Sequence, residues 1–228
     1  MRIRTINGRI TVRAAADAPP LPYERFTITL NPDGSRTLRA LSVSPNGSLI
    51  RDVNAHVSAD WVSRSGSTRV FLDGAWQGTV AKYAGPETIT SLVWTGGDAP
   101  DIRTFPAPAR FSLGFHPIAD EAWKMALIAP ETGRRQPLTT HTCSPRWNGK
   151  TIEHGETVHS EVEYVGEETI AVAGRDELCR VYVWHTPFGR IMRVWAMGEH
   201  HLFARMEVIE APNAGTIYEL TALEHESW

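Results

Sequence analysis

The sequence predicts a mainly β protein, an antiparallel meander that forms a barrel or a strongly curved sheet. Over most of the 228 residues, apolar and polar side chains alternate, as they do in a strand with one buried face. Turn-forming clusters of Gly, Pro, Asn and Asp interrupt this alternation about every ten residues, a spacing typical of all-β folds. Because all-β barrels of this length are commonly single domains, we expect residues 1–228 to form one domain.

The first third of the chain predicts successive hairpins. Asn7-Gly8 indicates a tight turn between strands over residues 2–6 and 9–13, because this pair readily adopts the positive φ of a type I′ turn. Further turns are expected where Gly, Pro, Asn and Asp cluster, at residues 31–34, 44–47 and 73–74. The strands that these turns separate are expected over residues 23–30, 36–43, 49–58, 68–72 and up to residue 80.

The centre of the chain departs from this pattern. Residues 96–130 contain several prolines and no strand period, which indicates an insert of the kind that forms lids and binding loops. Within it, apolar residues at spacings of three and four predict one short helix near residues 118–128. The last third returns to strands, expected over residues 136–143, 156–165, 169–173, 177–186, 190–197, 201–209 and 215–223.

Composition argues against two classes of partner. The chain has 23 basic and 26 acidic residues and a net charge of −3, so we expect no nucleic-acid partner, which would require a clustered basic surface. It has no apolar run of the roughly 20 residues that cross a membrane, and its N-terminal residues lack the continuous apolar segment of a signal peptide. We therefore expect a cytoplasmic protein without a membrane partner, in which Cys143 and Cys179 remain thiols.

Three late strands carry the most informative pattern. One face of these strands is aliphatic, whereas the other combines aromatic and basic side chains: Arg180, Tyr182, Trp184, Arg193, Trp195, His201, Phe203 and Arg205. In one interpretation this aromatic–arginine face lines a cavity, where the rings and Trp123 of the expected helix contact a ligand and Arg193 or Arg205 pairs with its carboxylate. In the others it is a solvated face with cation–π contacts or a homodimer interface.

His116 is the first candidate for acid–base chemistry. It precedes the expected helix, and Asp120 follows closely enough to orient or charge its imidazole, a group that transfers protons near neutral pH. The alternative is structural, since Pro117 and the acids at 120–121 suit the first turn of a helix.

Other histidines are secondary candidates. His185 and His201 fall near the ends of neighbouring expected strands, where the mouth of a barrel cavity would lie. His154, His159 and Glu161 are dense enough to suggest metal ligands, but His154 and His159 point to opposite faces of a strand. We therefore expect no metal, with His154 and His159 left as an open alternative.

Several absent motifs narrow the chemistry. The sequence has no Gly-x-Ser-x-Gly elbow, no phosphate-binding glycine-rich loop and no dinucleotide fingerprint, so no cofactor is expected. Gly74-Ala75-Trp76 matches the Gly-x-Trp of lipocalins, although in lipocalins this motif lies on the first strand rather than after several. The layout of strand-rich halves around a Pro-rich insert resembles calycin-type β-barrels in outline.

These observations favour a cofactor-independent enzyme of lyase type, a decarboxylase, dehydratase or hydratase. Its expected substrate is a small, hydrophobic, aromatic and anionic molecule, as in the breakdown of aromatic compounds, because acid–base groups in a desolvated pocket can carry such steps. His116 or His185 would move the proton. The alternatives are a non-catalytic carrier of a lipid or aromatic ligand, and a structural protein that uses the aromatic–arginine face as a dimer interface.

Overall fold

The computed structural model describes residues 4–144, 151–210 and 213–227. The predicted mainly β fold is confirmed: fifteen strands form one sheet in the order β8-β7-β6-β5-β4-β3-β2-β1-β15-β14-β13-β12-β11-β10-β9. The strands are β1 (Arg4–Arg13), β2 (Leu21–Leu30), β3 (Arg36–Val43), β4 (Leu49–Val57), β5 (Ser63–Leu72), β6 (Ala75–Ala84), β7 (Thr88–Trp94), β8 (Asp101–Pro106), β9 (Ser112–Gly114), β10 (Arg135–Thr142), β11 (Glu156–Val172), β12 (Arg175–His185), β13 (Ile191–Met197), β14 (Leu202–Val208) and β15 (Ile217–Ser227). Neighbouring strands are antiparallel except for β9 and β10.

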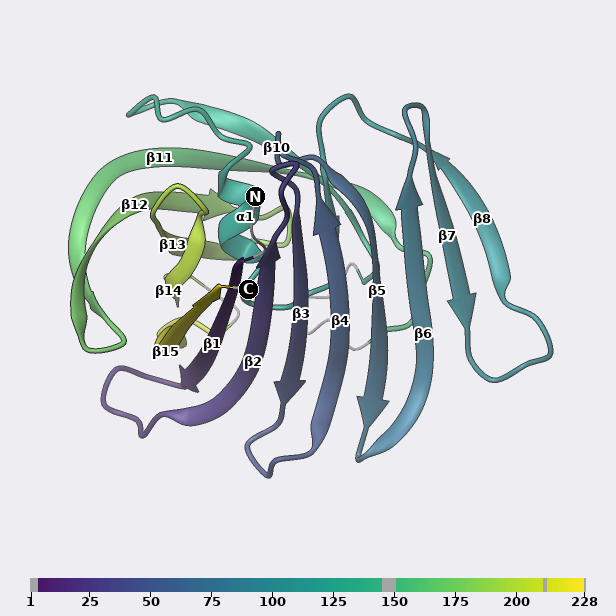
Figure 1. Ribbon diagram of the computed structural model, residues 1–228, viewed down its shortest axis with the longest axis horizontal. Coiled ribbons are helices and arrows are strands. Elements are labelled where there is room, and N and C mark those ends of the chain that lie inside the picture. The colour runs from purple at the N-terminus through teal and green to yellow at the C-terminus, as the bar shows by residue number, and fades with distance from the viewer. Residues whose placement is uncertain (1–3, 145–150, 211–212, 228) are drawn as a thin grey trace.

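The sheet is strongly curved but not closed by strand pairing. Strands β11 to β15 curve round beyond β1, and the helix α1 (Glu121–Met125) lies inside the curl (Figure 1). The curl brings β10 to β6, where Lys82 Nζ donates to the carbonyl oxygen of Thr142. The edge strand β9 reaches β5, where the Leu113 amide donates a hydrogen bond to Ser63 Oγ at 2.9 Å. Strands β7 and β8 extend beyond this contact as the other edge of the sheet.

The N-terminal hairpin predicted at Asn7-Gly8 is wrong. Strand β1 runs without a turn from Arg4 to Arg13 and pairs with β2 on one side and β15 on the other. Gly8 is required for packing, since a Cβ there would lie 2.1 Å from Cζ of Phe26, its partner on β2. The tertiary pairing thus overrides the local turn preference. Residues 2 and 3 of the predicted strand lie outside the described residues.

The central insert contains more strand and less helix than its sequence indicates. Strands β8 and β9 lie within residues 96–130, and β7 precedes them without having been predicted. Helix α1 has only five residues, and the turns that follow it use hydrogen bonds from residues 127 and 128 to the carbonyls three residues earlier. The two strands predicted over 156–165 and 169–173 are one strand, β11, with a bulge near Gly166.

The core lies between the two walls of the curl. All five residues of α1 are buried, and the helix contacts β13 and β14. Trp123 and Met125 of α1 belong to the same apolar cluster as Leu38 of β3 and Val194 of β13. Helix α1 is therefore part of the core inside the curl. No helix in the described part of the chain is long and apolar enough to span a membrane.

Candidate functional site

The protein contains a cavity of about 500 Å³. This volume falls within the range of small-molecule sites. Its wall is formed by residues of several strands, the segment before α1 and the β12–β13 loop: Tyr23, Ile50, Arg51, Gly114, His116, Ile118, Glu121, Lys124, Thr140, Thr142, Ser144, Val158, Ser160, Trp184, Thr186, Pro187, Phe188, Arg190, Met192, Met206 and Tyr218. We call this space the main cavity.

Three buried basic residues contribute to the wall of the main cavity. Arg51 comes from β4, Lys124 from α1 and Arg190 from the residue that precedes β13. The Arg51 guanidinium donates from Nη1 to the carbonyl oxygen of His116 at 2.9 Å. Two tyrosines lie in the same part of the wall: the rings of Tyr23 and Tyr218 meet edge to face at 5.1 Å. Burial raises the pKa of Tyr23 to about 12, so its phenol is neutral at pH 7. The cavity wall therefore combines this neutral phenol with the basic side chains of Arg51, Lys124 and Arg190.

His116 holds its predicted place at a cavity wall, with a fixed tautomer. Its Nε2 lies 2.9 Å from the carbonyl oxygen of Ser144 and 3.0 Å from Thr142 Oγ1. Because a carbonyl oxygen only accepts, Nε2 carries the proton and Nδ1 the lone pair. Burial, together with the charge of Arg51, lowers the pKa of His116 to about 3. The imidazole is therefore neutral at physiological pH, and its pKa lies far from the range that suits general acid–base catalysis.

Asp120, Glu121 and Lys124 form a buried charge cluster on α1 and its N-terminal neighbour. Lys124 Nζ lies 2.6 Å from Glu121 Oε2 and 3.5 Å from Asp120 Oδ1. Burial raises the pKa of Asp120 to about 8, against the opposing attraction of Lys124. Burial alone would lower the pKa of Lys124, but the two acids raise it. Glu121 and Lys124 reach the main cavity, whereas Asp120 borders a separate space of about 10 Å³ beside Trp61 and Trp123.

Glu24 of β2 fixes the segment that carries His116. Its carboxylate accepts hydrogen bonds from the backbone amides of Ile118 and Ala119 and from Ser42 Oγ, each at 2.9 Å. Burial raises the pKa of Glu24, while these hydrogen bonds oppose the increase. The side chain thus satisfies the two amides just before α1, which has no side-chain cap of its own.

The strand register divides the predicted aromatic–arginine face. Trp184 pairs with Met192, and Tyr182 pairs with Val194, and directly paired residues point to the same face of a sheet. Tyr182 and Trp184 therefore lie on the inner face with aliphatic residues, while Arg193 pairs with Val183. The predicted grouping of Tyr182 and Trp184 with Arg193 and Trp195 is corrected accordingly. The correction arises because alternation within each strand does not give the register between strands.

Of the predicted ligand-contacting residues, Trp184 joins His116 at the main cavity. Its indole Nε1 donates to Ser160 Oγ at 2.9 Å, and Lys124 Nζ lies 5.4 Å from the ring centroid. Met192 and Met206 line the cavity as well. The indole is thus held by a hydrogen bond and contributes apolar surface to a wall that also contains two methionines.

The other predicted site residues do not line the main cavity. Arg193 is exposed, and both Arg193 and Arg205 lie over the ring of Trp195, at 5.7 and 5.3 Å. Trp195 itself is buried and donates from Nε1 to Glu168 at 3.0 Å. Tyr182, Phe203 and Trp123 are core residues, and His185 is partly exposed at the end of β12.

His201 belongs to a cluster away from the main cavity. Its ring meets that of Trp61 edge to face at 5.1 Å, and its Nε2 lies 3.3 Å from Arg180 Nη1. Burial lowers the pKa of His201 to about 4. These contacts account for His201 as a packed, neutral side chain.

The histidines suspected of binding metal have other partners. His154 Nε2 lies 3.0 Å from Asp101 Oδ2, and His159 Nδ1 lies 3.2 Å from Thr139 Oγ1. Across residues 4–144, 151–210 and 213–227, no three His, Cys, Asp or Glu side chains gather in a way that could hold a metal ion.

Four charged residues at or near the cavity were not predicted from the sequence: Glu24, Arg51, Lys124 and Arg190. A signal was present for two of them. In β2, every second residue is buried from Glu24 onward, so Glu24 is one of these alternating positions. Arg51 occupies the same kind of position among the alternating buried residues of β4. A charged residue at a position where the alternation predicts an apolar one is expected to point into the core. Burying its charge costs free energy unless the charge is paired, so such a residue is a candidate for a specific role. No comparable signal marks Arg190, which lies in a turn.

Comparisons with known proteins bear on the fold. No family model and no curated protein matches the chain. Among solved structures, a β-barrel-like protein of the domain of unknown function DUF1849 from Brucella abortus is similar over 98% of this chain and 97% of that chain, with a TM-score of 0.56 and 10% identity. A DUF1089 family protein from Pseudomonas aeruginosa covers 83% of this chain and 89% of its own, with a TM-score of 0.46 and 11% identity. The chain thus shares a β-barrel-like fold with the Brucella protein.

Proposed function

We propose that this protein binds a small organic anion with an apolar body in the main cavity. The observation that carries the proposal is the presence of Arg51, Lys124 and Arg190, all buried, on the wall of one mostly apolar cavity. These side chains already have partners in the protein, and a ligand carboxylate in the cavity would add a charge-assisted contact to them. Arginine suits this role because its planar guanidinium can bind a carboxylate through two hydrogen bonds.

The apolar part of the wall supports an apolar ligand body. Trp184, Met192 and Met206 lie together on the inner faces of β12 to β14. Aromatic rings give a large contact area, and methionines adapt to ligands of different shape. Phe188, which is partly exposed in the β12–β13 loop, adds a further ring at the cavity. An aryl or alkyl chain of several carbons fits this surface.

Binding of matched acids and alcohols tests the proposal. We would titrate 3-phenylpropanoate, cinnamate and decanoate, and the alcohol of each, into the protein by calorimetry and tryptophan fluorescence. We expect saturable binding of at least one acid and weaker binding of its alcohol. Arg190→Gln should weaken binding of the acid about tenfold or more, about 1.4 kcal/mol, and leave the alcohol unchanged.

Arg193→Gln is the matched control, because Arg193 is an exposed arginine three residues away that does not line the cavity. It should leave both affinities unchanged. Failure of all the probes to bind saturably would contradict the proposal, as would equal loss of acid and alcohol binding in Arg190→Gln.

A second candidate function is cofactor-independent acid–base catalysis on the bound anion, of the lyase type that the sequence favours. It is supported by two contacts in series, from Asp120 to Lys124 and from Lys124 to Glu121, because Glu121 lines the cavity. A carboxyl group with a pKa of about 8 holds a proton near neutral pH and suits general acid catalysis. Because Asp120 borders a separate space, its proton would reach the cavity through Lys124, which gives one of its protons to Glu121 and is reprotonated by Asp120. In this candidate the buried cluster, rather than His116, supplies the proton to the ligand through Glu121.

Ultraviolet–visible spectra of bound aromatic acids, followed over hours, test the catalytic candidate. We expect a progressive spectral change that Asp120→Asn abolishes while ligand affinity is kept. Saturable binding with constant spectra would instead support a carrier.

A further inference from the structure

We infer that two copies of this chain associate through strand β8, which pairs antiparallel with its own copy about a two-fold axis. Strand β8 is an edge of the sheet (Figure 1). Among the described residues, β7 is the strand that pairs with it. The backbone amides and carbonyls on the side away from β7 are therefore placed to extend the sheet with another strand.

Strand β8 has few of the features by which proteins block a sheet edge. It contains no lysine, its pairing with β7 has no bulge, and its one proline, Pro106, is the last residue. Lysines, bulges and internal prolines are devices against association at an edge, as are short strands and other charged residues, and of these β8 has its length of six residues and two charges. The charges that β8 does carry, Asp101 and Arg103, are of opposite sign.

Among the registers centred on residues 101 to 103, these two charges favour one. If Ile102 lies opposite Ile102 of the second copy, Asp101 of each chain lies opposite Arg103 of the other. Opposite charges that face each other across strands are stabilising, whereas like charges are destabilising. A register centred on Asp101 or on Arg103 would place like charges opposite each other. Within one chain the two side chains are 3.0 Å apart and more than half exposed. Asp101 Oδ2 also lies 3.0 Å from His154 Nε2, so a contact with the second copy would add to the contacts that Asp101 already makes.

The outer face next to this edge is unusually apolar. Ile102 is 58% exposed, Tyr83 58% and Trp94 45%. The register places Ile102 opposite Leu92, and Leu92 opposite Ala81, so these residues share one face of β6 to β8. Pairing of two β8 strands would join the two apolar strips and bring Ile102 of each chain against that of the other.

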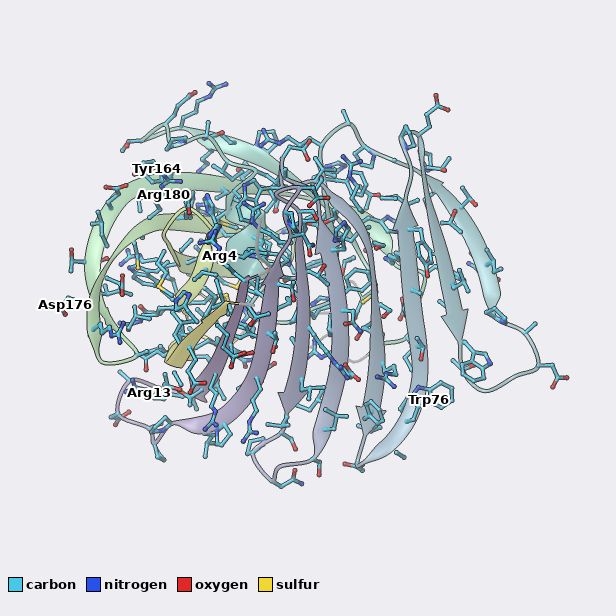
Figure 2. All side chains as sticks on the ribbon, in the orientation of Figure 1. Arg4, Arg13, Trp76, Tyr164, Asp176 and Arg180 are labelled. Carbon is cyan, nitrogen blue, oxygen red and sulfur yellow. The ribbon has the colours of Figure 1, made fainter. Side chains whose placement is uncertain are left out.

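Tryptophans continue the strip away from the edge. Trp76, labelled in Figure 2, contacts Trp94 with a ring-centroid distance of 5.1 Å. A second copy is the occupant that fits, because the charge pattern of β8 is complementary to itself and the apolar strip is repeated by symmetry. A short pair of strands buries less than a standard interface of about 1,600 Å², so we expect a dissociation constant in the micromolar range.

Sedimentation velocity of the full chain over about 1 to 300 µM tests this inference, a range that brackets a micromolar constant. We expect a concentration-dependent monomer–dimer equilibrium. Ile102→Lys should weaken dimerisation at least tenfold, whereas Leu178→Lys should not, because Leu178 is equally exposed, at 59%, but lies on β12.

A charge exchange identifies the register. Arg103→Asp alone should abolish dimerisation by placing acids opposite each other. The double variant Asp101→Arg with Arg103→Asp should restore it, because each new arginine then faces a new aspartate. Thermal unfolding of every variant confirms that it is folded. A monomer at all concentrations, a dimer unaffected by Ile102→Lys, or no restoration by the exchange would each overturn the inference.

Discussion

Lys82 of β6 donates a hydrogen bond from Nζ to the backbone carbonyl oxygen of Thr142 in β10, at 2.8 Å. The two strands are far apart in the order of the sheet, and they meet because the sheet curls. Lys82 is fully buried, and Nζ also lies 3.5 Å from the carbonyl oxygen of His141. Since the hydroxyl of Thr142 contacts His116, this bond connects β6 to the wall of the main cavity.

The stability of the protein should depend on the protonation of Lys82. Burial lowers the pKa of Lys82 from 10.5 to about 8. Between these values the unfolded state binds more protons than the folded state, so stability rises with pH. We expect the unfolding free energy of the wild type to increase by up to about 3 kcal/mol relative to Lys82→Met between pH 8 and 10.5. Urea denaturation at several pH values measures this difference, and a constant difference would contradict the lowered pKa.

His116 should remain neutral with its proton on Nε2. Its pKa of about 3 lies below the unfolded value of 6.5, so the folded state binds fewer protons and stability falls as the pH drops through 6.5 towards 3. We expect the imidazole nitrogen resonances of His116 to show the Nε2–H tautomer and no titration between pH 5 and 8. A measured pKa of His116 between 6 and 7 would contradict this geometry and would again make His116 the candidate acid–base group.

Replacement of Glu24 should loosen the segment before α1. Both carboxylate oxygens accept hydrogen bonds from N–H or O–H donors, so the amide group of Gln would turn its NH₂ towards a donor. We expect Glu24→Gln and Glu24→Ala each to cost about 2–4 kcal/mol of stability, since hydrogen bonds to charged groups are among the strongest in proteins. Denaturant unfolding measures the loss, and hydrogen exchange of the Ile118 and Ala119 amides locates it. Unchanged exchange at these amides would show that Glu24 does not hold the segment.

Gly8 should be intolerant of a side chain because of Phe26. A Cβ at Gly8 would lie within 2.8 Å of three carbons of the Phe26 ring, so Gly8→Ala should cost about 1–3 kcal/mol, as overpacking does. The cost should be smaller in a Phe26→Leu background, which a double-mutant cycle measures. Gly97→Ala is the control, because no atom lies within 4 Å of its added Cβ. Equal costs of Gly8→Ala in both backgrounds would exclude the ring as the cause.

The sequence alone determined the fold class and most of the strands. Alternation and turn residues are local properties, and they predicted the strands at 23–30 and 36–43 with little error. Local preference failed where distant pairing was stronger, as at Asn7-Gly8, where β2 and β15 hold both edges of a continuous strand. It also failed for β8, whose proline-rich surroundings concealed an edge strand.

Only the tertiary structure decided the composition of the candidate site. His116 and Trp184 were predicted, but Arg51, Lys124 and Arg190 come together from β4, α1 and a turn, and no local pattern states which segments will face each other. The assignment of faces required the register between β12 and β13, which alternation within one strand does not specify. Glu24 and Arg51 stand on the buried faces of strands that the sequence predicts, whereas Lys82 lies beyond the strand predicted up to residue 80. Except for Ser42, which pairs with Glu24 across the β2–β3 hairpin, their partners lie on segments distant in the chain, and only the curvature of the sheet brings them together.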